Sequence, residues 1–265
     1  MTSEKKIINT LKKINFKNYR TIYIAGNIYN FGFSVEETKS FCQNFLNNLK
    51  AITKNRMNIV VPTSTLDLLK KKNAVFTKNS KSFRMGIFSE YLRKLKGSKR
   101  SNHPLWSFSG IGKDVKKIFK TNHFSAYGKN SIFERLLEFD TIFISLGKPH
   151  KSIGMIHYAE HVVGVPYRFN KEFFIKTKVK NKIKKKYCTL GVRFNSKNIL
   201  QEQGNRIIIN TLQRKKIFKI IKLHKGEIFV ADYKLLVNTL IEMLLKNPRI
   251  WLKNNKMKQK NYFKG

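Results

Sequence analysis

The sequence has little cysteine and no long apolar run. Its 265 residues include two cysteines, Cys42 and Cys188, too few for a disulfide framework or a cysteine-rich zinc site. No apolar stretch reaches the ~18 residues of a membrane span. The opening segment, MTSEKKIINTLKK, lacks the continuous apolar region of a secretory signal. These absences predict a reducing, cytoplasmic setting and no membrane span.

Acidic residues are also scarce, since 15 Asp and Glu face 55 Lys and Arg, which gives a net charge of +40. Such a balance is typical of proteins with polyanionic partners. However, 44 of the 55 are lysines, and an AT-rich genome favours Lys, Asn and Ile codons. Compositional drift and an anionic ligand therefore both stay open. The shortage of carboxylates does argue against a strongly cationic substrate.

What is present is enough apolar material for a core, with 41% hydrophobic residues and 21 Phe. Capping boxes predict helices after Ser34 and Ser131, and apolar periodicity predicts another over 235–245. Apolar runs predict strands at 21–24, 57–61, 141–146, 207–209 and 228–230. Strands that alternate with helices predict a single α/β domain over residues 1–252. The basic segments 70–72 and 176–186 are expected to be exposed loops or faces, and 253–265 a frayed basic tail.

The first candidate site is the segment from Arg100 to Gly112, RSNHPLWSFSGIG. An arginine, serine hydroxyls and glycine backbone N–H groups suit a phosphate or pyrophosphate. The same residues also suit a structural turn, with Ser107 as a helix cap. Composition alone leaves both interpretations open.

The second candidate site is His157-Tyr158-Ala159-Glu160-His161, which follows an expected strand end, where α/β sheets usually carry their sites. On a helix His157, Glu160 and His161 share one face. As H-x-x-E-H the segment matches an inverted zinc-protease signature, which would need a third ligand downstream. As a His–Glu pair it is a general base with a neighbouring carboxylate. A charged helix face without chemistry is the third alternative.

Taken in order, these segments resemble the aminoglycoside 3-N-acetyltransferase family, the antibiotic N-acetyltransferases. The resemblance covers about residues 10–252. It is carried by the following segments: Ala25 to Gly32, Val60 to Thr65, Arg100 to Pro104, Ser107, Gly112, Gly128 to Leu136, Leu146-Gly147, His157 to Glu160 and Asn247-Pro248.

The resemblance implies a single α/β domain with a central mixed sheet flanked by helices. It implies direct transfer of an acetyl group from acetyl-CoA to a primary amine of an amino sugar, without a metal. By match to the family's motifs, His157 would be the general base and Glu160 its neighbour in the acceptor site. The CoA side would be lined by Gly26, Asn27, Thr63, Ser64, Arg100, Ser101 and Ser107.

Two positions depart from the family pattern. The family's His-Ser-Ser-Leu turn is Ala25-Gly26-Asn27-Ile28 here, so that both hydroxyls are lost, although the glycine N–H and the Asn27 amide offer substitutes. The threonine that commonly stands three residues before the histidine is Gly154. These departures point to a degenerate or a retargeted member of the family.

Charge bears on the identity of the acceptor. Aminoglycosides are polycations, and a protein of net charge +40 repels them over about one Debye length, ~8 Å at physiological salt. We therefore expect an amino sugar of lower positive charge, for example one attached to a nucleotide diphosphate. The alternatives are a zinc hydrolase built on His157, Glu160 and His161, and a nucleic-acid-binding protein. The last ranks lowest, because the aromatics mostly follow apolar periodic faces and no specific nucleic-acid partner is expected.

Overall fold

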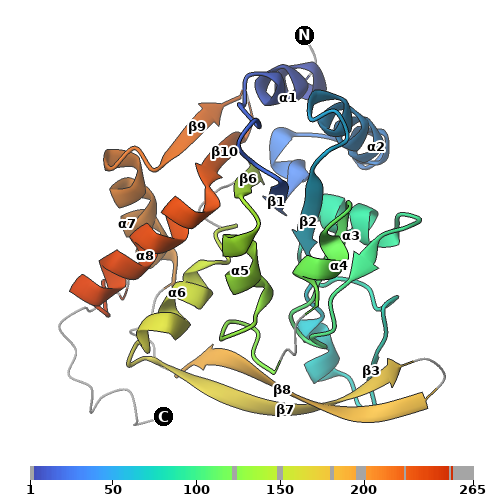
Figure 1. Cartoon of the computed structure of the whole chain (residues 1–265), viewed down its shortest axis with the longest axis vertical. Coiled ribbons are helices and arrows are strands. Elements are labelled where there is room, and N and C mark those ends of the chain that lie inside the picture. The colour runs from blue at the N-terminus through green and yellow to red at the C-terminus, as the bar shows by residue number, and fades with distance from the viewer. Residues whose placement is uncertain are drawn as a thin grey trace.

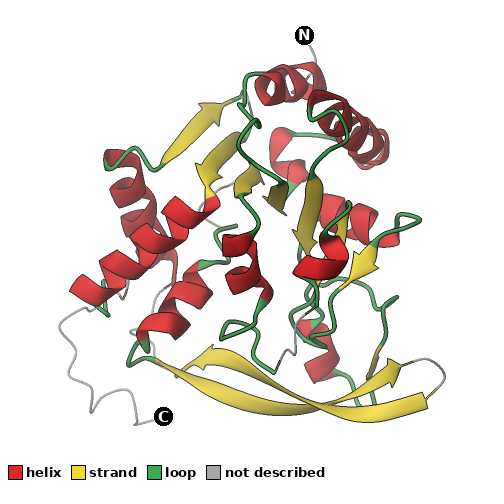
Figure 2. Cartoon of the chain, in the orientation of Figure 1, coloured by secondary structure: helices red, strands yellow, loops and turns green. Residues whose placement is uncertain are grey.

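The computed structural model describes residues 3–120, 124–147, 152–179, 182–194, 201–223, 225–250 and 252. Its centre is a seven-stranded mixed sheet in the order β4-β5-β2-β1-β6-β10-β9, and a second sheet has the order β3-β7-β8 (Figure 1, Figure 2). Strands β2, β1 and β6 are parallel to one another, whereas β5 and β10 run antiparallel to their neighbours. The predicted mixed α/β fold is confirmed.

The elements of the described chain follow in order. They are α1 (Ser3–Lys12), β1 (Thr21–Gly26), η1 (Ile28–Phe31), α2 (Val35–Ile52), β2 (Asn58–Pro62), η2 (Leu66–Lys70), β3 (Val75–Phe76), α3 (Ile87–Lys94), β4 (Lys99–Arg100), β5 (Phe108–Ile111), α4 (Val115–Ile118), α5 (Ile132–Arg135), η3 (Leu136–Glu138), β6 (Thr141–Gly147), α6 (Ile156–Val163), β7 (Arg168–Val179), β8 (Lys182–Arg193), α7 (Gln201–Arg214), β9 (Phe218–Lys222), β10 (Glu227–Asp232) and α8 (Tyr233–Lys246).

Successive strand residues point to opposite faces of a sheet, and in the central sheet helices bury both faces. In β1, Tyr23 belongs to the core packed against α4, α5, α6, α7 and α8, whereas Ile22 and Ile24 belong to the core packed against α1, α2 and α3. In β6, Phe143 and Ile144 divide in the same way. The sheet is therefore the middle layer of three, which explains why its strands read as continuous apolar runs.

The first predicted capping box forms in full and the second only in part. Ser34 accepts a hydrogen bond from the Glu37 N–H, and the Glu37 carboxylate accepts one from the Ser34 N–H. Ser131 likewise accepts from the Glu134 N–H, but Glu134 returns its bond to the N–H of Asn130, one residue earlier. The predicted helix over 235–245 is α8, which carries Leu236, Leu240 and Leu244 on its buried face. The predicted frayed tail, 253–265, lies outside the described residues.

One strand prediction is wrong. Residues 207–209 lie inside helix α7 rather than in a strand, because this helix lays Ile208 and Leu212, four residues apart, into the core. The three isoleucines alone do not distinguish a buried helix from a strand. The basic segment 176–186, expected to be an exposed loop or face, is a face: its described part forms the ends of β7 and β8 and is mostly exposed.

The β7–β8 hairpin pairs twelve residues with twelve, and β3 extends it by parallel pairing with β7. Its inner face carries Phe173, Cys188 and Leu190, which pack against the protein, and Cys188 is fully buried. In Figure 1 the hairpin forms the lower boundary of the molecule, opposite α1 and α2. No described helix is long and apolar enough to cross a membrane.

Candidate active site

A cavity of about 760 Å³ opens at the carboxyl end of β1. Parallel strands of α/β sheets usually hold their ligands at this edge. Three chain segments distant in sequence form most of its lining: the end of β1 with the following turn, residues 81–87, and residues 152–157 at the start of α6. Pro62, Glu90 and Trp106 complete it. Of the predicted site residues, Gly26, Asn27 and His157 line it.

His157 stands on the first turn of α6, with Glu160 on the same face three residues later. The His157 Nδ1 lies 2.9 Å from Glu160 Oε2, so the predicted histidine–carboxylate pair is formed in the structure. Glu160 is 2% exposed, and its other oxygen accepts a hydrogen bond of 2.9 Å from the Tyr167 hydroxyl. The carboxylate is thus fixed from two sides.

An arginine that the sequence analysis did not single out completes this cluster. Arg168, the first residue of β7, places Nε 2.6 Å from Glu160 Oε2 as an ion pair. Its terminal nitrogen lies 2.9 Å from the same His157 Nδ1 that faces Glu160. Nδ1 therefore has both a carboxylate acceptor and a guanidinium donor within reach. When Nδ1 carries the ring proton it donates to Glu160, and when Nδ1 is unprotonated it accepts from Arg168.

The surroundings of His157 favour its neutral form. Desolvation lowers the pKa of His157, and the positive charge of Arg168 lowers it further, against the opposite effect of Glu160. The ring of Tyr127 packs edge-on against the imidazole with centroids 5.2 Å apart. A neutral, sterically fixed imidazole is suited to accept a proton near neutral pH.

The third residue of the H-x-x-E-H pattern takes no part in this cluster. Burial lowers the pKa of His161, and a hydrogen bond with Asn170 opposes this effect. Among the described residues, no group of three or more His, Cys, Asp and Glu side chains is arranged to hold a metal ion. The Arg168 guanidinium also lies against both His157 and Glu160, where it opposes a bound cation. These contacts favour the acid–base interpretation over the zinc one.

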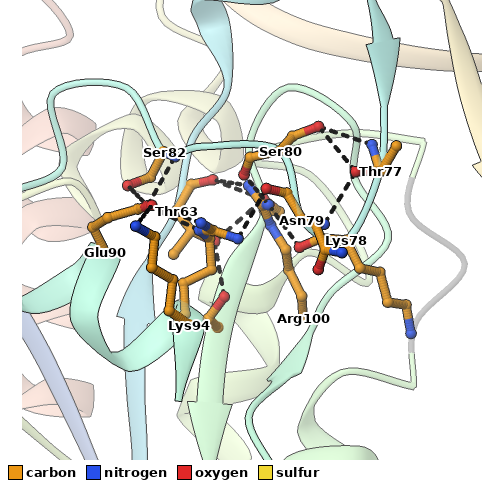
Figure 3. Close-up of polar contacts among 12 residues, drawn as sticks. Thr63, Thr77, Lys78, Asn79, Ser80, Ser82, Glu90, Lys94 and Arg100 are labelled. Atoms are coloured by element: carbon orange, nitrogen blue, oxygen red, sulfur yellow. Dashed lines mark hydrogen bonds and ion pairs between the residues drawn. The ribbon is translucent and has the colours of Figure 1, made fainter. Parts of the chain in front are cut away.

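Arg100 is buried and turned toward the protein rather than the cavity. It is 5% exposed, and Figure 3 shows its side chain among backbone groups of the segment 78–80. Its guanidinium donates to the carbonyl oxygens of Thr63 (2.7 Å), Lys78 (3.1 Å) and Ser80, and to Ser107 Oγ (3.0 Å). Desolvation lowers the pKa of Arg100 to about 10, with a smaller contribution from nearby Arg93. All three guanidinium nitrogens are thus used to hold one wall of the cavity in place.

The hydroxyl residues predicted for the CoA side occupy the same buried layer. Thr63, Ser64, Ser101 and Ser107 are each 1% exposed or less. Ser107 donates to the Thr63 carbonyl, Ser64 donates to the Leu105 carbonyl, and Ser101 accepts from the Phe108 N–H. These residues lie behind the cavity wall, and none of them lines the cavity.

The segment that Arg100 holds carries the charged residues of the cavity wall. Lys81 and Arg84 line the cavity and are exposed, and neither forms an ion pair with a described carboxylate. Glu90 also lines it, but Arg93 binds its carboxylate at 2.6 and 2.8 Å, and Ser82 donates to it as well (Figure 3). Burial alone would raise the pKa of Glu90, but these bonds lower it to about 2. The described wall therefore presents net positive charge.

The Gly26 turn is built from close backbone contacts. Gly26 has φ +116°, and a Cβ there would lie 2.1 Å from the Leu146 carbonyl oxygen. Gly86 has φ +88°, and a Cβ there would lie 2.2 Å from the Gly26 carbonyl oxygen. Side chains at these positions are incompatible with the observed backbone. Asn27 then caps η1 by accepting the Tyr29 N–H at 3.1 Å.

The comparisons with known proteins agree on one family. The family model described as aminoglycoside 3-N-acetyltransferase matches residues 33–245. An aminoglycoside N(3)-acetyltransferase III of Acinetobacter baumannii is 30% identical over 82 residues, which are 31% of this chain. The matched region spans 29% of that relative's length. The chain belongs to the aminoglycoside 3-N-acetyltransferase family.

Solved structures share the fold across nearly the whole chain. The aminoglycoside acetyltransferase AAC(3)-Xa superposes with a TM-score of 0.79 at 14% identity, covering 96% of this chain and 95% of its own. The YokD protein from Bacillus subtilis gives 0.74 at 18% identity, covering 93% and 100%. AAC-IIIb, solved as a binary complex with CoASH, gives 0.77 at 14% identity, covering 92% and 97%. At these identities the structures show a common fold.

Proposed function

We propose that this protein transfers an acetyl group from acetyl-CoA directly to a primary amine, with His157 as the general base. The observation that carries the proposal is the position of His157, which lines the cavity while its Nδ1 faces the buried carboxylate of Glu160. The family membership supports the reaction type. The CoA complex of AAC-IIIb, which has the same fold, supports the donor.

The hydrogen-bond geometry favours one protonation cycle. With its proton on Nδ1, His157 donates to Glu160, and the lone pair on Nε2 is available to an incoming ammonium or amine. As the amine nitrogen attacks the thioester carbon, its proton moves to Nε2. The C–S bond then breaks with its electron pair going to sulfur, and the His157 imidazolium gives the proton to this thiolate, so that CoA leaves as the thiol and the base is neutral again. The Glu160 carboxylate stabilises the imidazolium that forms. Such base catalysis contributes typically ~10²–10⁴-fold.

Arg168 limits how strongly the base holds its proton. Its positive charge beside Nδ1 opposes the imidazolium and lowers the pKa of His157, so that the base is neutral and returns its proton readily. Because Arg168 also pairs with Glu160, it fixes the carboxylate that orients the ring. We assign Arg168 as a positioning residue that acts through His157.

For the donor, we assign Gly26 and Asn27, which line the cavity, to the side of its wall that binds CoA. Arg100, Ser101, Ser107, Thr63 and Ser64 act behind it. We propose that they shape the donor side indirectly, by holding the segment that presents Lys81 and Arg84. Two exposed cations beside a cavity of this size suit the phosphate groups of an anionic ligand.

For the acceptor, we propose an amino sugar of lower positive charge than an aminoglycoside drug, for example one attached to a nucleotide diphosphate. The support comes from the described lining. Its carboxylate, Glu90, is bound by Arg93 and Ser82, and its free charges are Lys81 and Arg84. Among structures of the same fold, AAC-VIa was solved with sisomicin bound. A cationic antibiotic would need carboxylates that this part of the wall does not offer.

The test compares acceptors side by side. Initial rates of CoA release from acetyl-CoA are measured with kanamycin-type drugs and with UDP- and dTDP-linked amino sugars at the same concentration. We expect higher kcat/KM for the nucleotide-linked sugars. Efficient turnover of the drugs alone would defeat the acceptor proposal and leave the acetyl transfer standing. If acetyl-CoA fails to bind in calorimetry, the transferase proposal itself is wrong.

A further inference from the structure

The outer face of the β7–β8 hairpin is exposed and differs in character from its buried inner face. Three consecutive cross-strand pairs lie on this outer side: Phe174 with Tyr187, Lys176 with Lys185, and Lys178 with Ile183. Phe124, from the segment before α5, adds a third aromatic ring. We call these seven residues the basic aromatic face.

The apolar members of this face are exposed and adjoin one another. Phe174 is 67% exposed, and Phe124 and Ile183 are each 59% exposed. The Tyr187 ring lies between two of them, with centroid distances of 5.6 Å to Phe174 and 5.9 Å to Phe124. Exposed large apolar residues that gather in one place mark interaction surfaces, whereas single ones do not.

The charges around these rings have one sign. The described hairpin contains nine Lys and Arg residues and one acid, Glu172. That carboxylate accepts a hydrogen bond from the Tyr187 hydroxyl at 2.8 Å, at the edge of the basic aromatic face. Lys178 and Lys185 are exposed and form no ion pair with a described carboxylate. An anionic partner complements this arrangement.

Three partners of suitable chemistry are distinguished by details of the face. A second copy of the chain would bring the same lysines together and be repelled. Single-stranded nucleic acid needs aromatic rings on which successive bases stack, but here the rings are tilted by 52° and 55° against each other and Ile183 offers no platform. Aromatic and aliphatic side chains ringed by lysines fit the interface of an anionic bilayer.

We propose that the basic aromatic face binds the surface of membranes that contain anionic lipids. Phe174, Phe124 and Ile183 enter the headgroup region, and Lys178 and Lys185 pair with lipid phosphates. The hairpin lies at the boundary of the molecule opposite α1 and α2 (Figure 1), so the face reaches a flat surface without rearrangement of the central sheet. This proposal does not depend on the identity of the acceptor.

The experiment is co-sedimentation of the full-length protein with vesicles at physiological salt. Vesicles of phosphatidylcholine alone are compared with vesicles that also contain phosphatidylglycerol. We expect binding to the mixed vesicles only. The double variant Lys178→Glu/Lys185→Glu should weaken it by at least about tenfold, since each lysine near an anionic surface contributes measurably. Phe174→Ser/Ile183→Ser should weaken it about fivefold or more by removing the apolar contact.

The matched control is Lys12→Glu/Lys39→Glu, which changes the net charge equally on α1 and α2, at the far end of the molecule. It should retain binding within about twofold. Thermal unfolding of each variant shows whether it folds, and Lys178→Gln/Lys185→Gln replaces the charge reversal if that variant does not.

Three outcomes overturn the proposal. The first is no sedimentation with either kind of vesicle. The second is an equal loss of binding in the hairpin variants and in the control, which would indicate attraction by net charge alone. The third is tight binding of a single-stranded oligonucleotide that the hairpin substitutions abolish while vesicle binding stays absent.

Discussion

Two arginines support different parts of the cavity wall, Arg100 next to the segment 78–80 and Arg168 next to His157, and they differ in what they hold. Arg100, which belongs to a segment that suits phosphate, donates its hydrogen bonds to the carbonyl oxygens of Thr63, Lys78 and Ser80 and to a serine hydroxyl. Arg168, in no motif, contacts both members of the histidine–carboxylate pair. The comparison teaches that the type of residue predicts the kind of contact, whereas only the fold determines which groups receive it.

The largest expected effect is on catalysis and comes from replacing His157, which Arg168 contacts. His157→Ala should lower kcat by about 10²–10⁴-fold, because the base is lost, while the Kd for CoA changes by less than about twofold. Steady-state kinetics and calorimetry measure the two quantities. His161→Ala, on the same helix, is the control and should keep most activity. An equal loss in both variants would contradict the role of His157.

Replacing Arg100 is expected to affect the stability of the fold. Arg100→Ala should lower the free energy of unfolding by about 3 kcal/mol, because it leaves several buried acceptors without a donor. Denaturant unfolding gives this value. Arg84→Ala is the matched control, since Arg84 is exposed on the cavity wall: it should weaken binding of anionic ligands with little loss of stability. The opposite pattern would make Arg100 a direct ligand contact.

A smaller effect tests the positioning role of Arg168. Arg168→Met removes a positive charge that lowers the pKa of His157, so the pKa should rise. The base acts in its neutral form, and therefore the acidic limb of the kcat/KM profile should move to higher pH. Arg168→Lys keeps the charge and should leave the limb near its original position. A limb that does not move in Arg168→Met would show a structural role only.

The smallest effect concerns Gly154, where the family commonly has threonine. A Cβ at Gly154 would make only ordinary contacts, at 3.6–3.8 Å from Phe133 and the Tyr23 hydroxyl. Gly154→Thr should therefore change the free energy of unfolding by less than about 1 kcal/mol and raise kcat about threefold by better placement of His157. Gly128→Thr is the contrasting control, because its Cβ would lie 2.7 Å from His161. A strong loss of stability in Gly154→Thr would contradict this account.

The sequence predicts the central layer well because its signals are local. The strands that contain Tyr23, Val60 and Phe143 are apolar throughout, and the first capping box forms as written. The prediction fails at residues 207–209, because three consecutive apolar residues fit both a helix and a strand. Only the packing of Ile208 and Leu212 into the core distinguishes the two. For 176–186 the sequence predicts an exposed loop or face but does not reveal the hairpin, because lysines on its solvent face hide the alternation of Phe173 and Ile175 on the other face.

In the candidate site, the His157–Glu160 pair could be predicted because its members share one helix turn. Arg168 and Tyr167 come from beyond that helix, and nothing in their local sequence indicates that they turn back onto Glu160. The one available signal was the requirement that a buried carboxylate be paired, which directs the search to nearby Arg and Tyr. Similarly, the burial of Arg100 depends on the course of the segment 78–80, which no motif predicts.

The glycine contacts at the mouth of the cavity also constrain how this protein can change. A serine introduced at Gly26 to rebuild the family turn would collide with Leu146, and any side chain at Gly86 would collide with the carbonyl of Gly26. A hydroxyl side chain at Gly26 therefore requires the backbone of Leu146 on the neighbouring strand to shift, which a replacement at Gly26 alone does not provide. Laboratory evolution toward the family turn should accordingly vary residues around Leu146 together with Gly26.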